Sequence, residues 1–375
     1  MTNMFDYLKW RGDILFSQVP LNKIDALIFA QLSYVNMENL VCSDFSSPIT
    51  IKQLYQNYIN SKDFPTRNTS YYKKKKTTEL LAAAASCERY CNVEVCHHIQ
   101  IIDEQKSEQF KAVTFILPQQ TVIAISGTDD TIIGWKEDFM LSFSQNIPSY
   151  QDALTYFEKT ASYFSAPLIL TGHSKGGNIC INTAVNCDKK LQKQIQAVYN
   201  FDGPGFEKKF FLQDSFKQIE EKVFSFYPSG SIVGMIYYHP KKYEIVKSNG
   251  VALNQHKATL WEICGSDFIH EKEFASQSII FNESLNNWTR HVSEKNRAII
   301  ANNLFDIISS SGAKTLTELG HIKIKSLQNM FSTYTNLKNP QSEDLKLFVK
   351  IMFEVVQDTS PFGNIIKKGF FKKDT

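Results

Sequence analysis

The stretch LILTGHSKGGN, residues 168–178, decides the fold. It opens with a short apolar run of the kind found in buried strands, and it continues into glycines and other small residues that favour a tight turn. Gly172, Ser174 and Gly176 are spaced as G-x-S-x-G. A serine at a sharp strand-to-helix turn has strained backbone angles, and small residues two positions before and after it let the helix pass close to the strand. The stretch therefore predicts a strand, a turn with Ser174 at its apex, and a helix.

This turn matches the nucleophile elbow, which lifts a serine hydroxyl clear of a sheet and directs the next backbone N–H at a developing oxyanion. In this chain that next N–H belongs to Lys175. The five-residue spacing alone is not specific, but the apolar strand before it and the small residues after it provide the required context. A glycine-rich turn without catalysis stays the alternative. The spacing of a phosphate-binding loop, G-x-x-x-x-G-K-[ST], is absent.

Strand-like and helical segments surround this turn on both sides. Residues 118–120, Pro-Gln-Gln, fit a hairpin turn, and a helix is expected over 177–185. Because strands alternate with helices, we predict an α/β-hydrolase core over residues 106–270, with a mostly parallel central sheet flanked by helices. The expected strands are 110–117, 121–126, 166–170, 197–201 and 223–227.

The two ends of the chain are predicted to be helical extensions that cap or border the active site. Residues 1–105 are expected to be mainly helical, with one helix over 21–32 capped by Asn22 and another over 77–90. A polar linker is expected between them. Residues 271–375 are expected to form further amphipathic helices, over 293–309 and 343–357.

A serine hydroxyl is a weak nucleophile unless a base removes its proton. The α/β-hydrolases present nucleophile, acid and histidine in that chain order. We expect His256 to be the base because it lies in a loop after 243–246, the last expected strand. His239 and His270 are the alternatives.

The acid is expected to be Asp202, which ends a strand at the edge where active-site loops gather, although an aspartate in a D-G-P-G turn is often only a turn former. The second oxyanion donor is expected from Thr128, in the loop after the strand at 121–126. Trp135–Asp138 either anchors this loop or simply begins an amphipathic helix.

Composition excludes several other classes of protein. The net charge is only +3, from 41 basic and 38 acidic side chains, which argues against a nucleic-acid binder. The N-terminus lacks the pattern of a secretory signal, and no apolar run approaches the ~18 residues that span a bilayer. Seven scattered cysteines do not form a disulfide framework, so a reducing cytoplasmic setting is expected.

One cluster of cysteines and histidines raises the question of a metal. Its cysteines are separated by three and four residues rather than by the two of a structural zinc site, and we expect Cys87 and Cys91 to face a core instead. The cluster comprises Cys87, Cys91, Cys96, His97 and His98.

Together these motifs resemble an uncharacterised bacterial α/β-hydrolase family, mostly from Gram-positive species, which is in turn similar to the class 3 (fungal-type) triacylglycerol lipases. The resemblance covers nearly the whole chain. It implies Thr128 as the oxyanion residue, Ser174 as the nucleophile and His256 as the base. It is carried by residues 6–13, 125–130, 135–138, 172–178, 201–206, 231–235, 255–256 and Trp261.

Two positions depart from the lipases. Ser231 stands where the lipases carry their acid, and Ser126 stands where they commonly carry arginine. Either Asp202, one strand earlier, has taken over the role of the acid, or the triad is incomplete.

The expected reaction is hydrolysis of a carboxyl ester, from a small molecule or a lipid, through an acyl-enzyme on Ser174. It needs no metal or organic cofactor. A peptidase or thioesterase would use the same residues, and a catalytically silent protein that binds a lipid or a protein partner is a further alternative. No nucleic-acid partner is expected. The sequence gives no specific support for peripheral membrane contact and does not set the oligomeric state.

Overall fold

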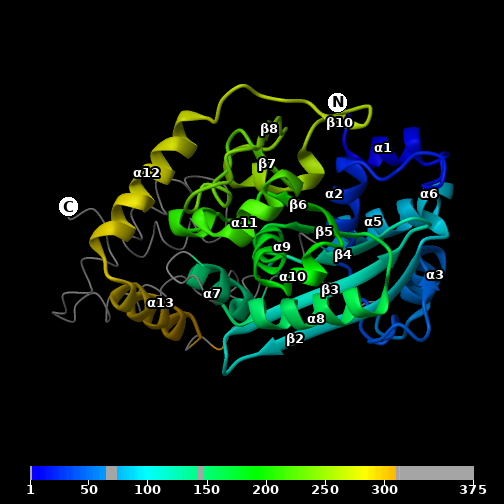
Figure 1. Ribbon diagram of the computed structural model, residues 1–375, viewed down its shortest axis with the longest axis horizontal. Coiled ribbons are helices and arrows are strands. Elements are labelled where there is room, and N and C mark those ends of the chain that lie inside the picture. Colours follow the sequence, from blue (N-terminus) through cyan, green and yellow to red (C-terminus); the bar gives the residue numbers. More distant parts are fainter. Residues whose placement is uncertain (1, 65–73, 130, 142–146, 310–311, 313–375) are drawn as a thin grey trace.

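The computed structural model describes residues 2–64, 74–129, 131–141, 147–309 and 312. Their order along the chain places mainly helices first, then strands alternating with helices, and then two helices again (Figure 1). The strands are β1 (Ile49–Thr50), β2 (Glu94–Asp103), β3 (Glu108–Ile116), β4 (Thr121–Ile125), β5 (Leu168–His173), β6 (Ile195–Phe201), β7 (Val223–Pro228), β8 (Glu244–Val246), β9 (Ile263–Cys264) and β10 (Asp267–Phe268). The α-helices are α1 (Met4–Arg11), α2 (Lys23–Leu32), α3 (Ile51–Asn60), α5 (Lys74–Ala85), α6 (Glu88–Cys91), α7 (Ile132–Leu141), α8 (Ser149–Tyr163), α9 (Lys175–Asn186), α10 (Lys189–Gln192), α11 (Asp214–Ile219), α12 (Ser276–His291) and α13 (Glu294–Ser309).

In the described part of the chain, strands β1 to β8 form one eight-stranded sheet in sequence order. The pairs from β1 to β4 are antiparallel, and the pairs from β4 to β8 are parallel. Strands β3 and β4 form the expected hairpin, and the expected parallel strands follow it along the chain. Helices cover both faces of the sheet, so the predicted α/β-hydrolase fold is confirmed.

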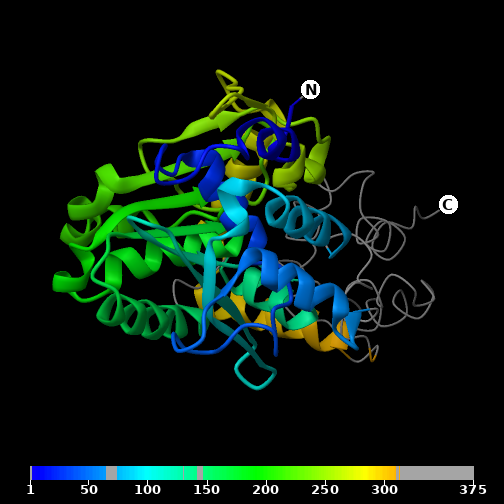
Figure 2. The ribbon, with the colours of Figure 1, turned by 90° about the vertical axis from the view of Figure 1, so that its right-hand side faces the viewer.

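The two faces of the sheet bury different side chains because successive residues of a strand point to opposite sides. In β4, Val122 and Ala124 pack in a core with the N-terminal helices, whereas Ile123 and Ile125 pack with α8 and α9. Figure 2 shows the N-terminal helices, in blue and light blue, on the side that faces the viewer. The N-terminal region therefore shares a core with the sheet.

Helix α2 lies where the sequence predicts it. Asn22 is its N-cap, and its side chain accepts from the backbone N–H groups of Ile24 and Asp25, while Asp25 accepts from the Asn22 N–H in return. This reciprocal capping box satisfies amide donors that the first turn leaves without helical acceptors. The helix expected over 77–90 is instead divided into α5 and α6, and α5 begins earlier, at Lys74.

Strand β2 is a feature that the sequence pattern did not predict, since residues up to 105 were expected to be mainly helical. The strand runs antiparallel to β3, and its register shifts between Cys96 and Ile99. His97, within the shift, has a positive φ of 49°. Such a bulge interrupts the alternation by which a strand is recognised, which explains the omission.

The C-terminal helices that the structure describes lie beside the loops at the carboxyl ends of the strands. Helix α13 corresponds to the helix expected over 293–309, and it packs against α7, as Figure 1 shows. The Asn282 side chain of α12 donates to the carbonyls of Met235 and Tyr237. The helix expected over 343–357 lies outside the described residues.

Candidate functional site

Ser174 lies at the apex of the turn between β5 and α9, as predicted. Its backbone has φ 59° and ψ −136°, a conformation that costs a non-glycine residue free energy and that clusters at functional sites. The Ser174 N–H donates to the Phe201 carbonyl at 2.9 Å, which ties the turn to the end of β6. The residue is 7% exposed, so the turn holds the serine in a largely enclosed position at the carboxyl edge of the sheet.

The glycines on both sides of Ser174 are required by close backbone contacts. A Cβ atom on Gly172 would lie 2.3 Å from the Gly176 carbonyl oxygen. A Cβ atom on Gly176 would lie 2.1 Å from the carbonyl oxygen of Ile125, at the end of β4. Both distances are below any real carbon contact, so helix α9 can pass this close to the strands only with glycine at these two positions.

Asp202 and His256 are brought together although 54 positions separate them in sequence. The distance between His256 Nδ1 and Asp202 Oδ2 is 2.6 Å. Because an ionised carboxylate only accepts hydrogen bonds, Nδ1 carries the hydrogen. In the neutral ring Nε2 is then the acceptor, which is the tautomer that a general base needs. The Asp202 side chain is fully buried, and the His256 side chain is 20% exposed.

Ser231, at the position where the lipases carry their acid, also contacts Asp202. Its hydroxyl donates to Asp202 Oδ1 at 2.5 Å and accepts from the Gly234 N–H at 3.0 Å. One carboxylate oxygen therefore faces the imidazole, and the other is held by Ser231. This arrangement gives the carboxylate of Asp202 a place within reach of His256 from one strand earlier than in the lipases.

Two residues that sequence reasoning missed hold the loop of His256 next to the nucleophile turn. His173 Nε2 lies 2.8 Å from the His256 carbonyl oxygen, so Nε2 carries the hydrogen and donates. His173 Nδ1 accordingly accepts from the Tyr34 hydroxyl at 2.9 Å. The ring centroids of His173 and His256 lie 4.5 Å apart. Burial, followed by the charge of Asp138, raises the pKa of Tyr34, which keeps its hydroxyl protonated.

Tyr34 comes after α2, far from the motif in sequence, so no local pattern marks it. His173 stands inside the motif, where its bond to the His256 carbonyl depends on tertiary structure.

The two expected oxyanion donors belong to segments that adjoin Ser174. Lys175 is the first residue of α9, and backbone N–H groups in the first turn of a helix have no acceptor within the helix. Thr128 is buried in the loop after β4. That loop touches the nucleophile turn, because a Cβ atom on Gly127 would lie 2.9 Å from Ser174 Cβ. The structure thus brings both segments to the serine.

Residues 135–138 belong to helix α7, which begins three residues earlier than expected, at Ile132. Glu137 Oε2 lies 2.6 Å from the ammonium nitrogen of Lys175, at the start of α9. That this segment anchors the Thr128 loop stays a prediction.

His239, the first alternative base, lies among aromatic rings rather than on the Asp202 carboxylate. Its ring centroid lies 4.8 Å from that of Tyr227 and 6.0 Å from that of Tyr243. Burial lowers the pKa of His239 to about 4, although the Asp202 charge acts in the opposite direction, so the ring stays neutral around pH 7.

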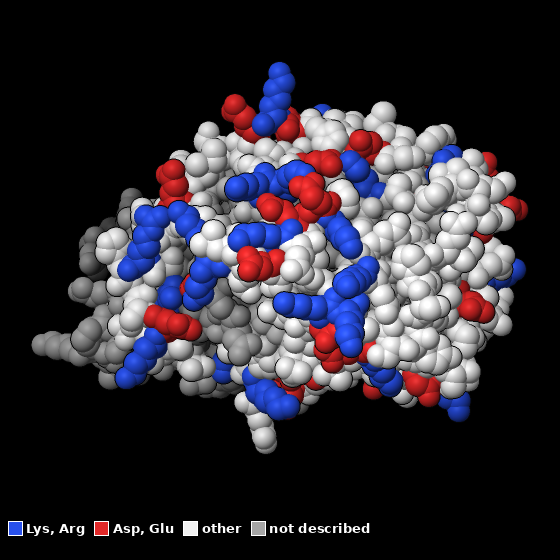
Figure 3. All heavy atoms as spheres, viewed as in Figure 1, with Lys and Arg blue, Asp and Glu red and all other residues white. Residues whose placement is uncertain are grey.

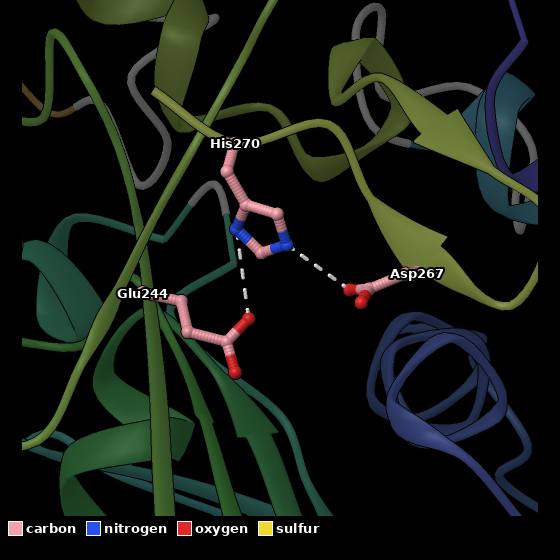
Figure 4. A group of neighbouring side chains, drawn as sticks. All are labelled: Glu244, Asp267 and His270. Atoms are coloured by element: carbon pink, nitrogen blue, oxygen red, sulfur yellow. Dashed lines mark hydrogen bonds and ion pairs between the residues drawn. The ribbon is translucent and has the colours of Figure 1, made fainter. Parts of the chain in front are cut away.

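His270, the second alternative, lies in an exposed polar cluster with Glu244 and Asp267 (Figure 4). Its ring nitrogens lie 3.6 Å from Glu244 and 3.2 Å from Asp267. These three side chains have the chemistry and proximity to hold a metal ion. However, the ammonium group of Lys23 already lies 2.9 Å from each of the two carboxylates, and it supplies the positive charge that they need.

The cysteine and histidine cluster, all of it among the described residues, is not a group whose ligand atoms lie close enough together to share a metal ion. Its cysteines form no disulfide. His97 Nδ1 lies 3.2 Å from Thr160 Oγ1, and its ring stacks on Tyr156 at 4.1 Å. Burial lowers the pKa of His97 to about 4. Its role is therefore in packing, with Cys96 buried beside it in the same strand. Cys87 and Cys91 are half-buried.

Basic and acidic side chains lie interspersed on the face of the molecule seen in Figure 3, as the near-balanced composition leads one to expect. Among the described residues, no helix combines the length and the apolar character that crossing a membrane requires.

Comparison with known proteins identifies the family. The model of the Mbeg1-like family matches residues 84–306, which is more than half of the chain, and the protein belongs to this family. Among solved structures, the chain is similar to one described as the crystal structure of M37 lipase, with 16% identity and a TM-score of 0.37. That similarity covers 58% of this chain and 70% of the other. No curated protein matches.

Proposed function

We propose that this protein is a serine hydrolase that cleaves carboxyl esters through an acyl-enzyme on Ser174. The observation that carries the proposal is the 2.6 Å contact between Asp202 and His256, whose carbonyl bonds to His173, next to a serine held at φ 59° on a nucleophile elbow. Nucleophile, acid and base occur in the chain order of the α/β-hydrolases. The resemblance of the sequence motifs to those of the class 3 lipases points to the same class of chemistry.

In this mechanism His256 Nε2 takes the proton of the Ser174 hydroxyl as its oxygen attacks the ester carbonyl. Asp202 keeps the hydrogen of the neutral ring on Nδ1 and stabilises the imidazolium that forms. The N–H groups of Thr128 and Lys175 hold the oxyanion. His256 then gives the proton to the leaving alcohol, and a water molecule repeats the sequence to release the acid and restore Ser174.

A fluorophosphonate probe tests this proposal, because it phosphonylates a serine only where that serine is activated. We expect the wild-type protein to be labelled on Ser174 and the Ser174→Ala variant, folded equally well by circular dichroism, not to be labelled. A folded wild-type protein that takes up no label would contradict the proposal and favour a silent hydrolase-like protein that binds a lipid or a partner.

Esters with an apolar acyl chain are the proposed substrate class, in keeping with the 13% of aromatic residues and the resemblance of the motifs to those of the class 3 lipases. A series of p-nitrophenyl esters of increasing chain length measures this preference. We expect kcat/KM to rise with chain length above acetate, since each added methylene buries apolar area. A preference for thioesters or peptides over every ester in the series would replace this assignment.

A further inference from the structure

The residue that follows the nucleophile, Lys175, forms a fully buried ion pair with Glu137. The ammonium nitrogen of Lys175 lies 2.6 Å from Glu137 Oε2, and neither side chain is exposed. The same ammonium donates to the Gln109 carbonyl at 2.6 Å and to its side-chain oxygen at 3.1 Å. An ammonium has three hydrogens to donate, so the Lys175 side chain is fully used in these three bonds.

The carboxylate of Glu137 is equally occupied. Its Oε2 accepts from the Gln109 backbone N–H at 3.0 Å as well as from Lys175. Its Oε1 accepts from the backbone N–H and the hydroxyl of Ser149, at 3.1 and 2.6 Å. Both charges are therefore held in fixed positions by side chains and backbone from β3 and α8.

Stability alone does not account for this pair. Removing two charges from water is costly, and well-packed apolar side chains of similar volume often stabilise a protein as well or better. The nucleophile elbow requires only the backbone N–H of the residue after the serine, so an apolar side chain would serve at this position. The role of the Lys175–Glu137 pair therefore follows from the two segments that it connects.

The pair connects the two segments that carry the proposed oxyanion donors. Lys175 supplies one donor from its own backbone. Glu137 belongs to α7, whose first turn touches the other donor: a Cβ atom on Gly134 would lie 2.9 Å from Thr128 Cγ2. The same Cβ atom would lie 3.1 Å from the Gln109 side-chain oxygen that accepts from Lys175. One ion pair thus links the two sides of the oxyanion hole.

We propose that Lys175, through its side chain, and Glu137 form a positioning pair that sets the separation of the Thr128 and Lys175 N–H groups. The proposal rests on the proposed hydrolase function. Oxyanion donors act only when they lie about 2.7–3.1 Å from the developing charge, and a misplacement of about 1 Å costs about 100-fold in rate. The pair acts on the transition state, because the substrate carbonyl in its ground state needs this alignment less.

The test replaces both charges at once, in the double variant Lys175→Met with Glu137→Leu. A single substitution leaves an unpaired buried charge, whereas the double variant leaves none. We expect the Tm of the double variant to lie above that of either single variant but below that of the wild type, because the Gln109 and Ser149 groups that bond to the pair lose their partners. With a p-nitrophenyl ester we expect kcat to fall about 100-fold and KM to stay within about 2-fold.

A folded double variant with wild-type kcat would overturn the proposal and leave the pair a purely structural feature. If the double variant fails to fold, Lys175→Arg decides, since it keeps the charge but changes the reach of the side chain. We expect it to fold and to lose at least about 10-fold in kcat at unchanged KM. An unaltered kcat in a folded Lys175→Arg protein would equally overturn the proposal.

The pair between Arg89 and Asp25 provides a matched control. It too is fully buried, with 2.7 Å between Arg89 Nη2 and Asp25 Oδ2, but it joins the N-terminal helices and does not contact Ser174 or its two neighbours. Arg89→Lys is expected to lower Tm and to leave kcat of the folded protein within about 2-fold. If the wild type takes up no fluorophosphonate, the hydrolase function itself fails. If the wild type is labelled and the double variant keeps full kcat, only the positioning pair fails.

Discussion

The nucleophile turn at Ser174 and the turn at Asp202, here called the acid turn, share a positive φ in two different sequence contexts. Ser174 is the first residue after β5, and Asp202 is the first residue after the neighbouring β6. Their φ angles are 59° and 53°. Each N–H donates to the last part of the next strand, Ser174 to the Phe201 carbonyl and Asp202 to the Phe226 carbonyl, at 2.9 and 2.8 Å. In both turns a residue with positive φ presents its side chain at the carboxyl edge of the sheet.

The two turns differ in the segment that comes after each of them. After Ser174 a helix passes back across the strands, which demands Gly172 and Gly176. After Asp202 the chain continues without a helix, and the Gly203 N–H donates to the Asn200 side chain at 3.0 Å instead. The turn at Asp202 also needs glycine, because a Cβ atom on Gly205 would lie 2.0 Å from the Tyr238 carbonyl oxygen, but its glycines both come after the aspartate and so do not form the G-x-S-x-G spacing. What distinguishes this turn is the contact of Asp202 with His256, which only the folded chain brings about.

The largest expected effect is that of removing the charge at the acid turn. Asp202→Asn keeps the shape but cannot hold the hydrogen of His256 on Nδ1, so kcat for a p-nitrophenyl ester is expected to fall about 10⁴-fold. Steady-state kinetics on protein with an unchanged circular dichroism spectrum measures this loss. Turnover within about 10-fold of the wild type would remove Asp202 from the mechanism and break the parallel between the turns.

Gly176→Ala tests the close passage of the helix at the nucleophile turn. Its Cβ atom would lie 2.1 Å from the Ile125 carbonyl oxygen, a backbone atom that cannot move away alone, so we expect a loss of about 3 kcal/mol in the free energy of unfolding. Gly265→Ala is the control. Its φ is +60° and the nearest atom lies 3.9 Å from the added Cβ, so only backbone strain of about 1–2 kcal/mol is expected. Urea denaturation compares the two, and equal losses would contradict the packing argument.

Ser231→Ala sharpens the account of the acid turn, because it removes the hydroxyl that donates to Asp202 Oδ1. A hydrogen bond to a buried charged group contributes about 1.5–3 kcal/mol, so kcat is expected to fall about 10- to 150-fold, short of the Asp202→Asn effect. The same kinetic assay measures it. A loss as large as that of Asp202→Asn would mean that Ser231 does more than hold the carboxylate.

Tyr34→Phe carries the smallest expected effect. It removes the hydroxyl that donates to His173 Nδ1, and with it one of the bonds that hold the loop of His256 near the nucleophile turn. A neutral hydrogen bond contributes about 0.5–1.5 kcal/mol, so kcat is expected to fall about 3- to 10-fold. Tyr58→Phe, at a hydroxyl 3.5 Å from Thr78 on the N-terminal helices, is the control and is expected to leave kcat unchanged.

The sequence predicts structure where the residues that impose a backbone conformation lie within a few positions of one another. Gly172, Ser174 and Gly176 predict the turn because the strand-to-helix crossing leaves no room for larger residues. The order of strands and helices around it predicts the sheet. Asn22 predicts the start of α2 for the same reason, since a capping side chain acts on its own first turn.

The remainder depends on contacts between distant segments. Tyr34 reaches His173 across 139 positions, and Glu137 meets Lys175 across 38. The bulge at His97 explains why the sequence pattern does not predict strand β2, because it shifts the alternation of buried and exposed residues. Asp202, too, has the sequence context of a turn former, and only its contact with His256 in the folded chain distinguishes the two roles.

The central claim is that His256, held by Asp202, activates Ser174. The second-order rate constant for fluorophosphonate modification of Ser174, in the wild type and in His256→Asn, tests it without requiring a natural substrate. The account predicts that Ser174 is modified in the wild type and that the reaction slows by at least about 10³-fold in the folded His256→Asn protein. Equal rates in the two proteins would show that His256 is not the base.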